Sequence, residues 1–281
     1  MQTLVEVLKK TELYFRGRGI PSPRLDAELI MAKVLNKSRI QLYMSFDQPM
    51  TEQELGPMRQ MVRRRAQREP LAWILGSRGF YNEEFIVHRD VLVPRPDTEE
   101  LIEAALELLP EDEPAVLVDV GCGTGCIGLT LALERKKLRV YSIDVSAAAL
   151  ACTQANIEKL DLADRVTLLE GSLLSPLPAG LVVDIVVSNP PYIATGDLAG
   201  LSPEVSHHEP RLALDGGEDG LTIYTTLIPS AAALAQRAVL VEVGAGQAAD
   251  VCALFEQAGL SNVQTRRDLG GHERVVSGTV G

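Results

Sequence analysis

The chain has 281 residues, of which 46% are hydrophobic and 23% are charged. This length and composition are typical of a globular protein with one or two domains. No stretch approaches about 18 consecutive apolar residues, which excludes a transmembrane helix, and the first residues lack the basic and apolar regions of a signal peptide. The four cysteines fit neither a zinc-binding spacing nor a secreted disulfide framework. We therefore expect reduced thiols, no metal and a cytoplasmic location.

The net charge of −11 is unevenly divided along the chain. Residues 1–80 contain 14 Lys and Arg against 8 Asp and Glu, whereas residues 81–281 contain 13 against 30. The first part therefore carries +6 and the second −17. Such an asymmetry predicts two modules and suggests a partner for the basic one.

The basic module is expected to be helical, because apolar residues recur at helical spacing in two stretches that each follow a proline. Its basic residues gather in the second stretch, at 51–69. Two interpretations of this stretch stay open: a solvated helix face, or a docking surface for an acidic protein or for RNA. The basic residues concerned are Arg59, Arg63, Arg64, Arg65 and Arg68.

Two short strands are predicted next, within the segment from Gly79 to Pro94, and they would form a hairpin between the modules. A helix is predicted to begin near Asp97, because Asp97 and Glu100 have the spacing of a capping box. We therefore expect three parts in chain order. They are a helical domain (1–78), a linking hairpin (79–96) and a third domain (97–281).

Predicted strands and helices alternate through the third domain. This alternation predicts an α/β fold with a mostly parallel sheet and helices on both faces, and ligands bind such sheets beyond the carboxyl ends of the strands. Helices are expected at 146–160 and 247–258, among others. The strands are expected at 115–120, 139–144, 165–170, 182–188 and 238–243, with two weaker ones near 263–267 and 274–278.

A glycine-rich loop follows the first of these strands. Residues 119–125 read Asp-Val-Gly-Cys-Gly-Thr-Gly, and the alternate glycines let the backbone turn tightly and approach a ligand closely. Asp144 ends the next strand, where its carboxylate can accept hydrogen bonds from ribose hydroxyls. Gly123, Gly125 and Gly128 also match the dinucleotide fingerprint, so the loop alone is compatible with NAD and with S-adenosylmethionine.

A second motif, Asn189-Pro190-Pro191-Tyr192, ends the fourth strand. The two prolines fix their backbone angles and donate no hydrogen bonds, so the segment is stiff and presents carbonyl acceptors. The Asn189 side-chain oxygen and the Pro190 carbonyl can each accept one hydrogen of a planar NH2 group, with the Tyr192 ring beside it. The motif predicts a holder for an amide or a base amino group, and a rigid turn is the structural alternative.

The pattern Asp-x-Gly-x-Gly-x-Gly resembles motif I of the class I methyltransferases, and no histidine has a context suited to hydride transfer, so we favour S-adenosylmethionine. Together with Asn-Pro-Pro-Tyr, the sequence resembles the release factor glutamine methyltransferases, the HemK/PrmC-type family. The resemblance extends to residues 69–76, 91–99, 209–221 and 242–247. It implies a class I, Rossmann-like α/β fold with a seven-stranded, mostly parallel sheet, preceded by a small helical domain and a linking hairpin.

The resemblance also implies the reaction. A methyl group would pass from S-adenosylmethionine to the side-chain amide nitrogen of the Gln in the Gly-Gly-Gln motif of peptide chain release factors. Asn189, Pro190 and Tyr192 are expected to be catalytic. These three residues and Pro191 would bind the substrate.

Further site residues follow from the same resemblance. Arg95, Thr98 and Glu99 are expected to line the crevice. Ser172 stands where many class I enzymes carry an acidic residue for the adenine amino group, so weaker contacts are expected there. The residues expected to bind the cofactor are Asp119, Gly121, Cys122, Gly123, Thr124, Gly125, Asp144, Val145, Ser172, Leu173 and Asn189.

Release factors are therefore the expected partners of a monomeric enzyme, with no DNA and no membrane partner. The basic helical domain would dock the release factor. Three alternatives stay open: a nucleic-acid amino methyltransferase, a non-catalytic binding protein, and an enzyme for another protein with a Gly-Gly-Gln-like motif. The −17 charge of the second part argues against the first of these, because such a surface repels phosphates.

Overall fold

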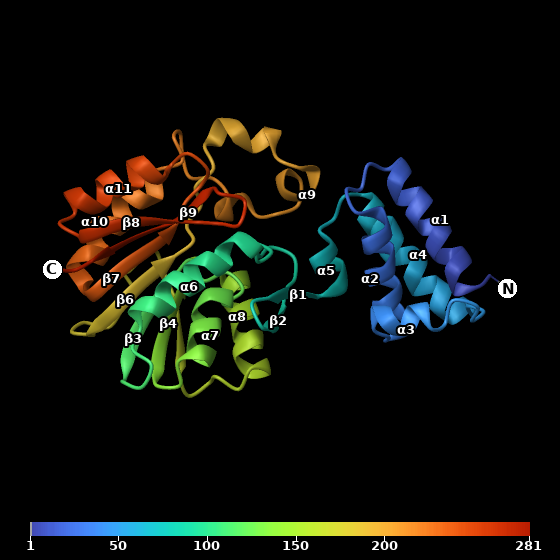
Figure 1. Cartoon of the computed structure of the whole chain (residues 1–281), viewed down its shortest axis with the longest axis horizontal. Helices are drawn as coiled ribbons and strands as arrows, with labels where there is room; N and C mark the ends of the chain where they lie inside the picture. Colours follow the sequence, from blue (N-terminus) through green and yellow to red (C-terminus); the bar gives the residue numbers. More distant parts are fainter. Residues whose placement is uncertain (1) are drawn as a thin grey trace. The chain divides into compact units, whose positions relative to one another are not determined.

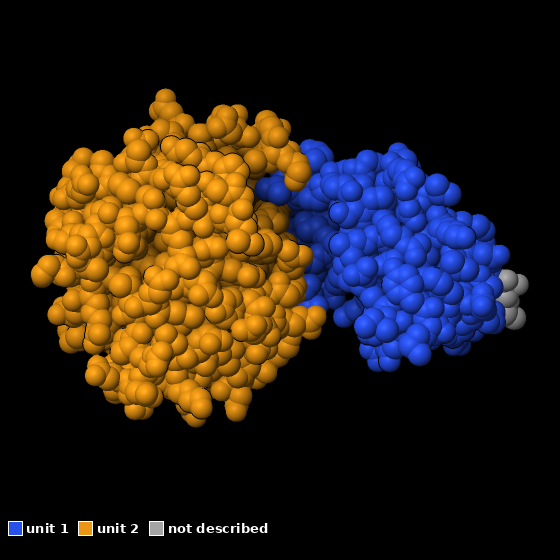
Figure 2. All heavy atoms as spheres, in the orientation of Figure 1, with its two compact units in different colours: residues 1–77, 203–208 blue, residues 78–202, 209–281 orange. Residues whose placement is uncertain are grey.

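The protein is described by a computed structural model that covers residues 2–281. The chain forms two compact units, drawn in different colours in Figure 2. Unit 1 contains the chain up to Ser77 and, in addition, residues Pro203–His208. Unit 2 contains Arg78–Ser202 and Glu209–Gly281. A short segment from the middle of the second sequence part therefore belongs to the first unit, whereas the sequence suggests continuous ranges.

Unit 1 is helical, as its apolar spacing predicts. Its core contains Leu8, Phe15, Met31 and Met58, all of which are buried. Three helices start at polar caps of the kind that satisfies free backbone N–H groups, at Thr3, Ser38 and Thr51. The helices are α1 (Leu4–Gly17), α2 (Pro23–Leu35), α3 (Arg39–Tyr43), α4 (Glu52–Ala66), α5 (Leu71–Leu75) and the inserted α9 (Pro203–Ser206) (Figure 1).

The basic residues of α4 do not form a single free surface. Arg65 is buried and donates to Asp26 at 2.7 Å, and its guanidinium also pairs with Glu204 of α9 at 2.9 Å. Arg68, just beyond α4, pairs with Glu204 at 2.7 Å. Two further ion pairs join Arg64 to Glu69 and Arg59 to Glu52. Arg65 is buried and so cannot be part of a docking surface, and both Arg65 and Arg68 pair with Glu204 of α9, while Arg63 is exposed.

The hairpin between the sequence parts is shorter than predicted. Its strands are β1 (Ser77–Phe80) and β2 (Glu83–Ile86), which form a two-stranded sheet. Tyr81 adopts a positive φ of 53° in the tight turn that it forms with Asn82, and the second strand begins at Glu83. The prediction of a strand at Val91–Pro94 is wrong. That segment has no regular structure, and its valines are buried in unit 2.

Unit 2 contains a seven-stranded sheet in the order β5-β4-β3-β6-β7-β9-β8. Neighbours from β5 to β7 are parallel, and β9 is antiparallel to both β7 and β8. This confirms the predicted mostly parallel sheet. The strands are β3 (Ala115–Val120), β4 (Leu138–Asp144), β5 (Val166–Glu170), β6 (Val183–Ser188), β7 (Ala235–Glu242), β8 (Ser261–Arg267) and β9 (Glu273–Thr279).

Helices cover both faces of this sheet (Figure 1). Side chains alternate between the faces along a strand, so Leu117 joins the core under α6 and α7 while Val118 joins the core under α10 and α11. The helices of this unit are α6 (Glu99–Leu108), α7 (Cys126–Glu134), α8 (Ala147–Lys159), α10 (Thr222–Leu234) and α11 (Ala248–Gln257), and the short 3₁₀ turns are η1 (Pro96–Thr98), η2 (Thr195–Gly200) and η3 (Arg211–Ala213).

The start of α6 differs from its prediction. Residues 96–98 form the 3₁₀ turn η1, and the helix proper begins at Glu99. The Asp97 carboxylate pairs with Arg274 of β9 at 2.9 Å. The capping-box prediction for Asp97 and Glu100 is therefore wrong, because a tertiary ion pair takes the side chain that was expected to cap the helix.

Candidate functional site

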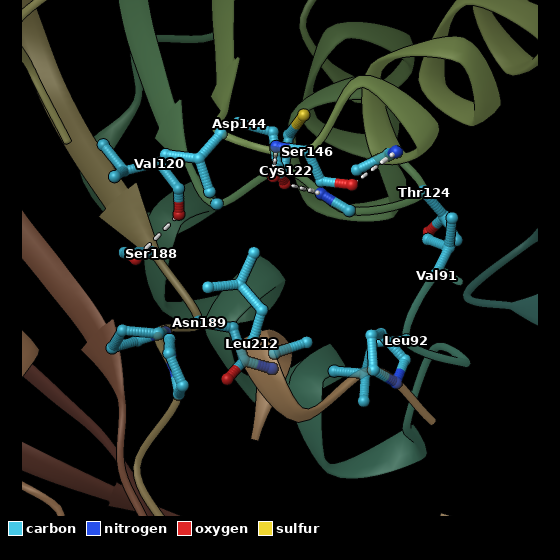
Figure 3. Close-up of a pocket in the computed structure, with 18 of the residues that line it drawn as sticks. Val91, Leu92, Val120, Cys122, Thr124, Asp144, Ser146, Ser188, Asn189 and Leu212 are labelled. Atoms are coloured by element: carbon cyan, nitrogen blue, oxygen red, sulfur yellow. Dashed lines mark hydrogen bonds between the residues drawn. The ribbon is translucent and has the colours of Figure 1, made fainter. Parts of the chain in front are cut away.

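A cavity of about 290 Å³ lies in unit 2, beyond the carboxyl ends of β3, β4 and β6. This is the edge at which parallel α/β sheets bind ligands. Figure 3 shows Asp144, Cys122 and Ser146 along one side of the cavity and Asn189 and Leu212 on the side across from it. The two predicted motifs therefore face the same space.

The glycine-rich loop after β3 forms one wall. Gly121, Gly123 and Gly125 all have positive φ angles, which side chains rarely tolerate. A Cβ atom on Gly125 would come within 2.7 Å of Thr153 and 2.9 Å of Leu129, so this glycine allows the loop to pack against α8 and α7. A Cβ atom on Gly121 would meet no atom within 4 Å. The wall at Gly121 is therefore bare backbone facing open space.

Asp144 holds this loop while it borders the cavity. Its Oδ2 atom accepts a hydrogen bond from the Gly123 N–H at 2.9 Å, and its Oδ1 atom accepts one from the Ser146 N–H at 2.9 Å. Both oxygens keep further lone pairs for a ligand. Val145, next in the chain, is exposed and lines the same cavity.

Two residues expected to touch the cofactor lie outside the cavity lining. Gly125 packs behind the loop as described. Asp119 is fully buried, and its Oδ2 accepts a hydrogen bond from the Gly128 N–H at 3.0 Å. Burial raises the pKa of Asp119 to about 7, with the Asp144 charge adding to the effect. The geometry makes Asp119 a support of the loop. The expected residues that do line the cavity are Gly121, Cys122, Gly123, Thr124, Asp144, Val145, Ser172, Leu173 and Asn189.

Asn189 follows the last residue of β6. The Ser188 hydroxyl donates to the Val120 carbonyl at 2.8 Å and ties the ends of β6 and β3 together (Figure 3). The Asn189 Nδ2 atom donates to the Thr98 Oγ1 atom at 3.2 Å. Oδ1 is then the carboxamide atom that can accept a hydrogen bond from a ligand. Pro190 and Pro191 continue the cavity wall.

Tyr192 lies behind this wall and is not among the lining residues. Its hydroxyl donates to the Glu242 Oε1 atom at 3.3 Å, and its carbonyl accepts a hydrogen bond from Gln247 Nε2 at 2.8 Å. Burial and the Glu242 charge raise the pKa of the Tyr192 hydroxyl. The ring packs against the core on the side of the sheet that α10 and α11 cover.

Of the three residues expected to line the crevice, only two do so. Arg95 and Thr98 line the cavity, and Arg95 pairs with the buried Glu209 at 2.5 Å. Glu99 instead accepts a hydrogen bond from the Tyr81 N–H of the hairpin turn at 3.0 Å. Burial raises the pKa of the Glu209 carboxyl, against the effect of the Arg95 charge.

Sequence reasoning missed part of the lining. The segment after Glu209 contributes Pro210, Leu212, Ala213 and Asp215, and Leu212 is 62% exposed. This long connection between β6 and β7 leaves the ligand-binding edge of the sheet, and that position alone would have singled it out. Glu242, at the end of β7, was also missed as an individual residue.

The two cysteines that line the cavity are buried thiols. Burial raises the pKa of the Cys126 thiol to about 12 and that of Cys122 well above its ordinary value, so neither is a ready nucleophile. Within residues 2–281, no group of three or more His, Cys, Asp or Glu side chains is placed to hold a metal ion. No helix in that range is long and apolar enough to cross a membrane.

Known structures identify the fold of unit 2. A methyltransferase from Pyrococcus furiosus superimposes with a TM-score of 0.52 at 16% identity, covering 70% of this chain and 88% of that one. This likeness shows the fold alone. Unit 2 therefore has the fold of a class I methyltransferase, with the glycine loop and Asp144 at the ligand-binding edge of its sheet.

Sequence comparisons then identify the family. Residues 6–76 match the PrmC N-terminal domain, and residues 101–204 match the methyltransferase small domain. The release factor glutamine methyltransferase of Geobacter sulfurreducens is 41% identical over 99% of this chain and 97% of its own. The release factor glutamine methyltransferase of Caulobacter vibrioides is 37% identical over 98% of this chain and 96% of its own. The chain belongs to the release factor glutamine methyltransferases.

Proposed function

We propose that this enzyme transfers a methyl group from S-adenosylmethionine to the side-chain amide nitrogen of the Gln in the Gly-Gly-Gln motif of peptide chain release factors. Asn189 carries the proposal, because its carboxamide stands across the cavity from the glycine loop and Asp144. Membership of the family supports the same substrate.

The residues at the cavity fit S-adenosylmethionine. Bare backbone at Gly121 leaves room for the methionine part, and the Asp144 carboxylate has lone pairs for ribose hydroxyls. Val145 and Leu173 offer apolar surface to an adenine ring, with the Ser172 hydroxyl as the polar side chain beside them. When bound, the cofactor supplies an electrophilic methyl group. No metal is part of the proposal.

The amide nitrogen of the substrate is a weak nucleophile, since its lone pair is delocalised into the carbonyl group. We assign the Asn189 Oδ1 atom and the Pro190 carbonyl as acceptors for its two N–H groups. These two hydrogen bonds orient the lone pair and offset the positive charge that builds on nitrogen. Such positioning contributes up to about 7–11 kcal/mol in favourable cases. No general base is required, because the alkylated amide is acidic and loses its proton readily.

Mass spectrometry of release factor peptides after incubation with the protein and S-adenosylmethionine tests this function. We expect one added methyl group on the Gln of the Gly-Gly-Gln peptide. Ribosomal RNA, DNA and other proteins with Gly-Gly-Gln-like motifs are incubated in parallel. Methylation of a nucleic acid with none on the release factor would contradict the proposal.

We also propose that the protein acts as a cytoplasmic monomer and that unit 1 docks the body of the release factor. Arg63 is the exposed charge of α4 suited to test the docking. Arg63→Glu should raise KM for the whole release factor and leave KM for a short Gly-Gly-Gln peptide unchanged. An equal change in KM for both substrates would show that Arg63 is not part of the docking surface.

A further inference from the structure

Leu212 is a large apolar side chain that stands exposed at the cavity. It lies in the 3₁₀ turn η3, lines the cavity and is 62% exposed. Single exposed leucines are common on protein surfaces, so exposure alone carries no argument. Leu212 differs from an ordinary surface leucine because the backbone is held in place on both sides of it.

An ion pair holds the chain before η3. The Glu209 carboxylate accepts a hydrogen bond from the Arg95 Nη2 atom at 2.5 Å. The Glu209 side chain is 1% exposed, and Arg95 lines the same cavity as Leu212. Pro210 follows Glu209 directly and fixes its own φ angle. The chain therefore enters the turn from an anchored point.

Backbone hydrogen bonds hold the chain after η3. The Ile193 N–H donates to the Leu214 carbonyl at 3.0 Å, and the Gly216 N–H donates to the Ile193 carbonyl at 2.8 Å. A Cβ atom on Gly216 would come within 2.8 Å of the Pro191 carbonyl oxygen, so only a glycine permits this close approach. The turn that carries Leu212 is therefore attached to the Asn-Pro-Pro-Tyr segment and to the residue after it.

The side of the cavity on which Leu212 lies indicates its ligand. Among the exposed large hydrophobic residues of the described chain, Val145 and Leu212 line the cavity. Val145 follows Asp144, on the side assigned above to S-adenosylmethionine. Leu212 lies with Asn189 on the side across from Asp144 (Figure 3). This is the side to which the proposed function assigns the substrate amide.

A glutamine side chain consists of an amide group and two methylene groups. The acceptors assigned to the amide, on Asn189 and Pro190, are oxygen atoms, and they offer no apolar surface to the methylene groups. Methylene groups gain free energy on binding when they leave water for an apolar surface. Leu212 offers such a surface at the cavity.

We propose that Leu212 is a specificity-determining residue that packs against the two methylene groups of the substrate Gln. In this arrangement the Arg95–Glu209 ion pair is the anchor that keeps η3, and with it Leu212, in place. The inference rests on the proposed function and deepens it, because it names the residue that recognises the aliphatic part of the side chain.

The contact predicts an effect on KM and little effect on kcat. The methylene groups take no part in the reaction, so their packing is equal in the bound substrate and in the transition state. Leu212→Ala should raise KM for a Gly-Gly-Gln peptide roughly tenfold. Leu212→Met keeps the apolar volume and should retain most of the affinity. Leu212→Asn has a similar size but is polar, and its KM should rise as much as that of Leu212→Ala.

Leu269→Ala is the matched control. Leu269 is fully exposed, lies between β8 and β9 of unit 2 and is not among the cavity-lining residues. Its replacement should leave KM and kcat unchanged. Equal KM for Leu212→Ala and Leu269→Ala would overturn the inference.

Two further measurements separate the substrate contact from other roles of Leu212. Calorimetry should show that Leu212→Ala binds S-adenosylmethionine as the unmodified protein does. Thermal unfolding of this variant should also be unchanged, because the side chain is exposed. Weaker cofactor binding together with an unchanged KM for the peptide would overturn the inference, since Leu212 would then contact the cofactor.

Glu209→Gln tests the anchor. The amide keeps the size of the side chain but removes the charge that pairs with Arg95. This substitution should raise KM for the peptide in the unmodified protein and add no further increase in Leu212→Ala, because both changes act on one contact. An equal increase in both backgrounds would overturn the role of the anchor. If Glu209→Gln does not fold, the variants of the exposed Leu212 decide the inference by themselves.

The failure of this inference is distinguishable from that of the proposed function. An unmodified protein that leaves release factor peptides unmethylated would overturn the proposed function. Methylation of the peptide by the unmodified protein, with an unchanged KM in Leu212→Ala, would overturn the role of Leu212 alone.

Discussion

Asn189 owes its position to three local constraints. It follows a buried strand, the Ser188 hydroxyl ties that strand to the Val120 carbonyl, and two prolines fix the chain after it. Its carboxamide is further held by Thr98. A side chain fixed in this way loses little freedom when a substrate binds, which is what catalysis by positioning requires.

Asn189→Ala should lower turnover far more than cofactor affinity. The substitution removes one acceptor for the substrate amide and costs about 1–3 kcal/mol, or roughly tenfold to a hundredfold in kcat. Cofactor contacts at Asp144 and the glycine loop remain. Kinetics with a Gly-Gly-Gln peptide and calorimetry with S-adenosylmethionine measure the two quantities. Equal losses in both would show that Asn189 serves the cofactor instead.

Residues in local motifs were predictable from the sequence, and residues that act through tertiary contacts were not. The positions of Asn189 and Asp144 at strand ends follow from short patterns of neighbouring residues. Thr98 was expected in the crevice, but its bond to Asn189 joins residues 91 positions apart, and no local pattern contains it. The same holds for Glu242 and Tyr192.

The glycine loop is the element on which the cavity depends most. Gly125→Ala should destabilise the protein by more than the roughly 1–3 kcal/mol of backbone strain alone, because its φ is 80° and the new Cβ atom would clash with Thr153 and Leu129. Gly180→Ala is the matched control. Gly180 has a φ of 78°, and a Cβ atom there meets no atom within 4 Å.

Urea unfolding of the two variants measures the difference, and the strain common to both cancels in the comparison. Gly125→Ala should also weaken the binding of S-adenosylmethionine, since the displaced loop forms the cavity wall. Gly180→Ala should leave that affinity intact. Equal stability of the two variants would mean that α7 and α8 shift enough to accommodate the extra methyl group.

Whole elements were predictable to the extent that burial determines them. The central strands are rich in buried apolar residues, and their predicted ranges agree with β3 to β7 within a few residues. The hairpin strand at Val91–Pro94 failed because apolar residues are also buried in irregular segments. The cap at Asp97 failed because Arg274, far away in the chain, competes for its carboxylate.

At the scale of the molecule, the chain passes between its units at three places, next to Ser77, Pro203 and His208. The inserted α9 is held in unit 1 by Glu204, which pairs with Arg65 and Arg68. No sequence pattern announces such an insertion, because Arg68 and Glu204 are 136 positions apart. The sequence shows the cluster of arginines, but it does not show the acidic residues with which they pair.

Arg65→Met should destabilise the protein by about 3–5 kcal/mol, because it leaves the buried Asp26 carboxylate without its partner. Arg63→Met, on the exposed side of the same helix, should change stability by no more than about 0.5 kcal/mol. Urea unfolding followed by circular dichroism compares the two variants. Equal stabilities would show that the ion pairs of Arg65 contribute little beyond their own desolvation.

The buried Glu242 carboxyl gives the stability of the molecule a definite pH dependence. Its pKa is raised from 4.5 to about 7 in the folded protein, so the folded state binds the proton more tightly than the unfolded state does. The stability this confers is fully present below about pH 4.5 and is lost as the pH rises to about 7. The loss is roughly 3 kcal/mol.

Glu242→Gln should not suffer this loss. Its free energy of unfolding, relative to the unmodified protein, should therefore rise by roughly 3 kcal/mol between pH 4.5 and pH 8. Asp119, whose pKa is also about 7, affects both proteins alike and cancels. Urea unfolding at a series of pH values measures the difference, and a difference that does not vary with pH would contradict the raised pKa.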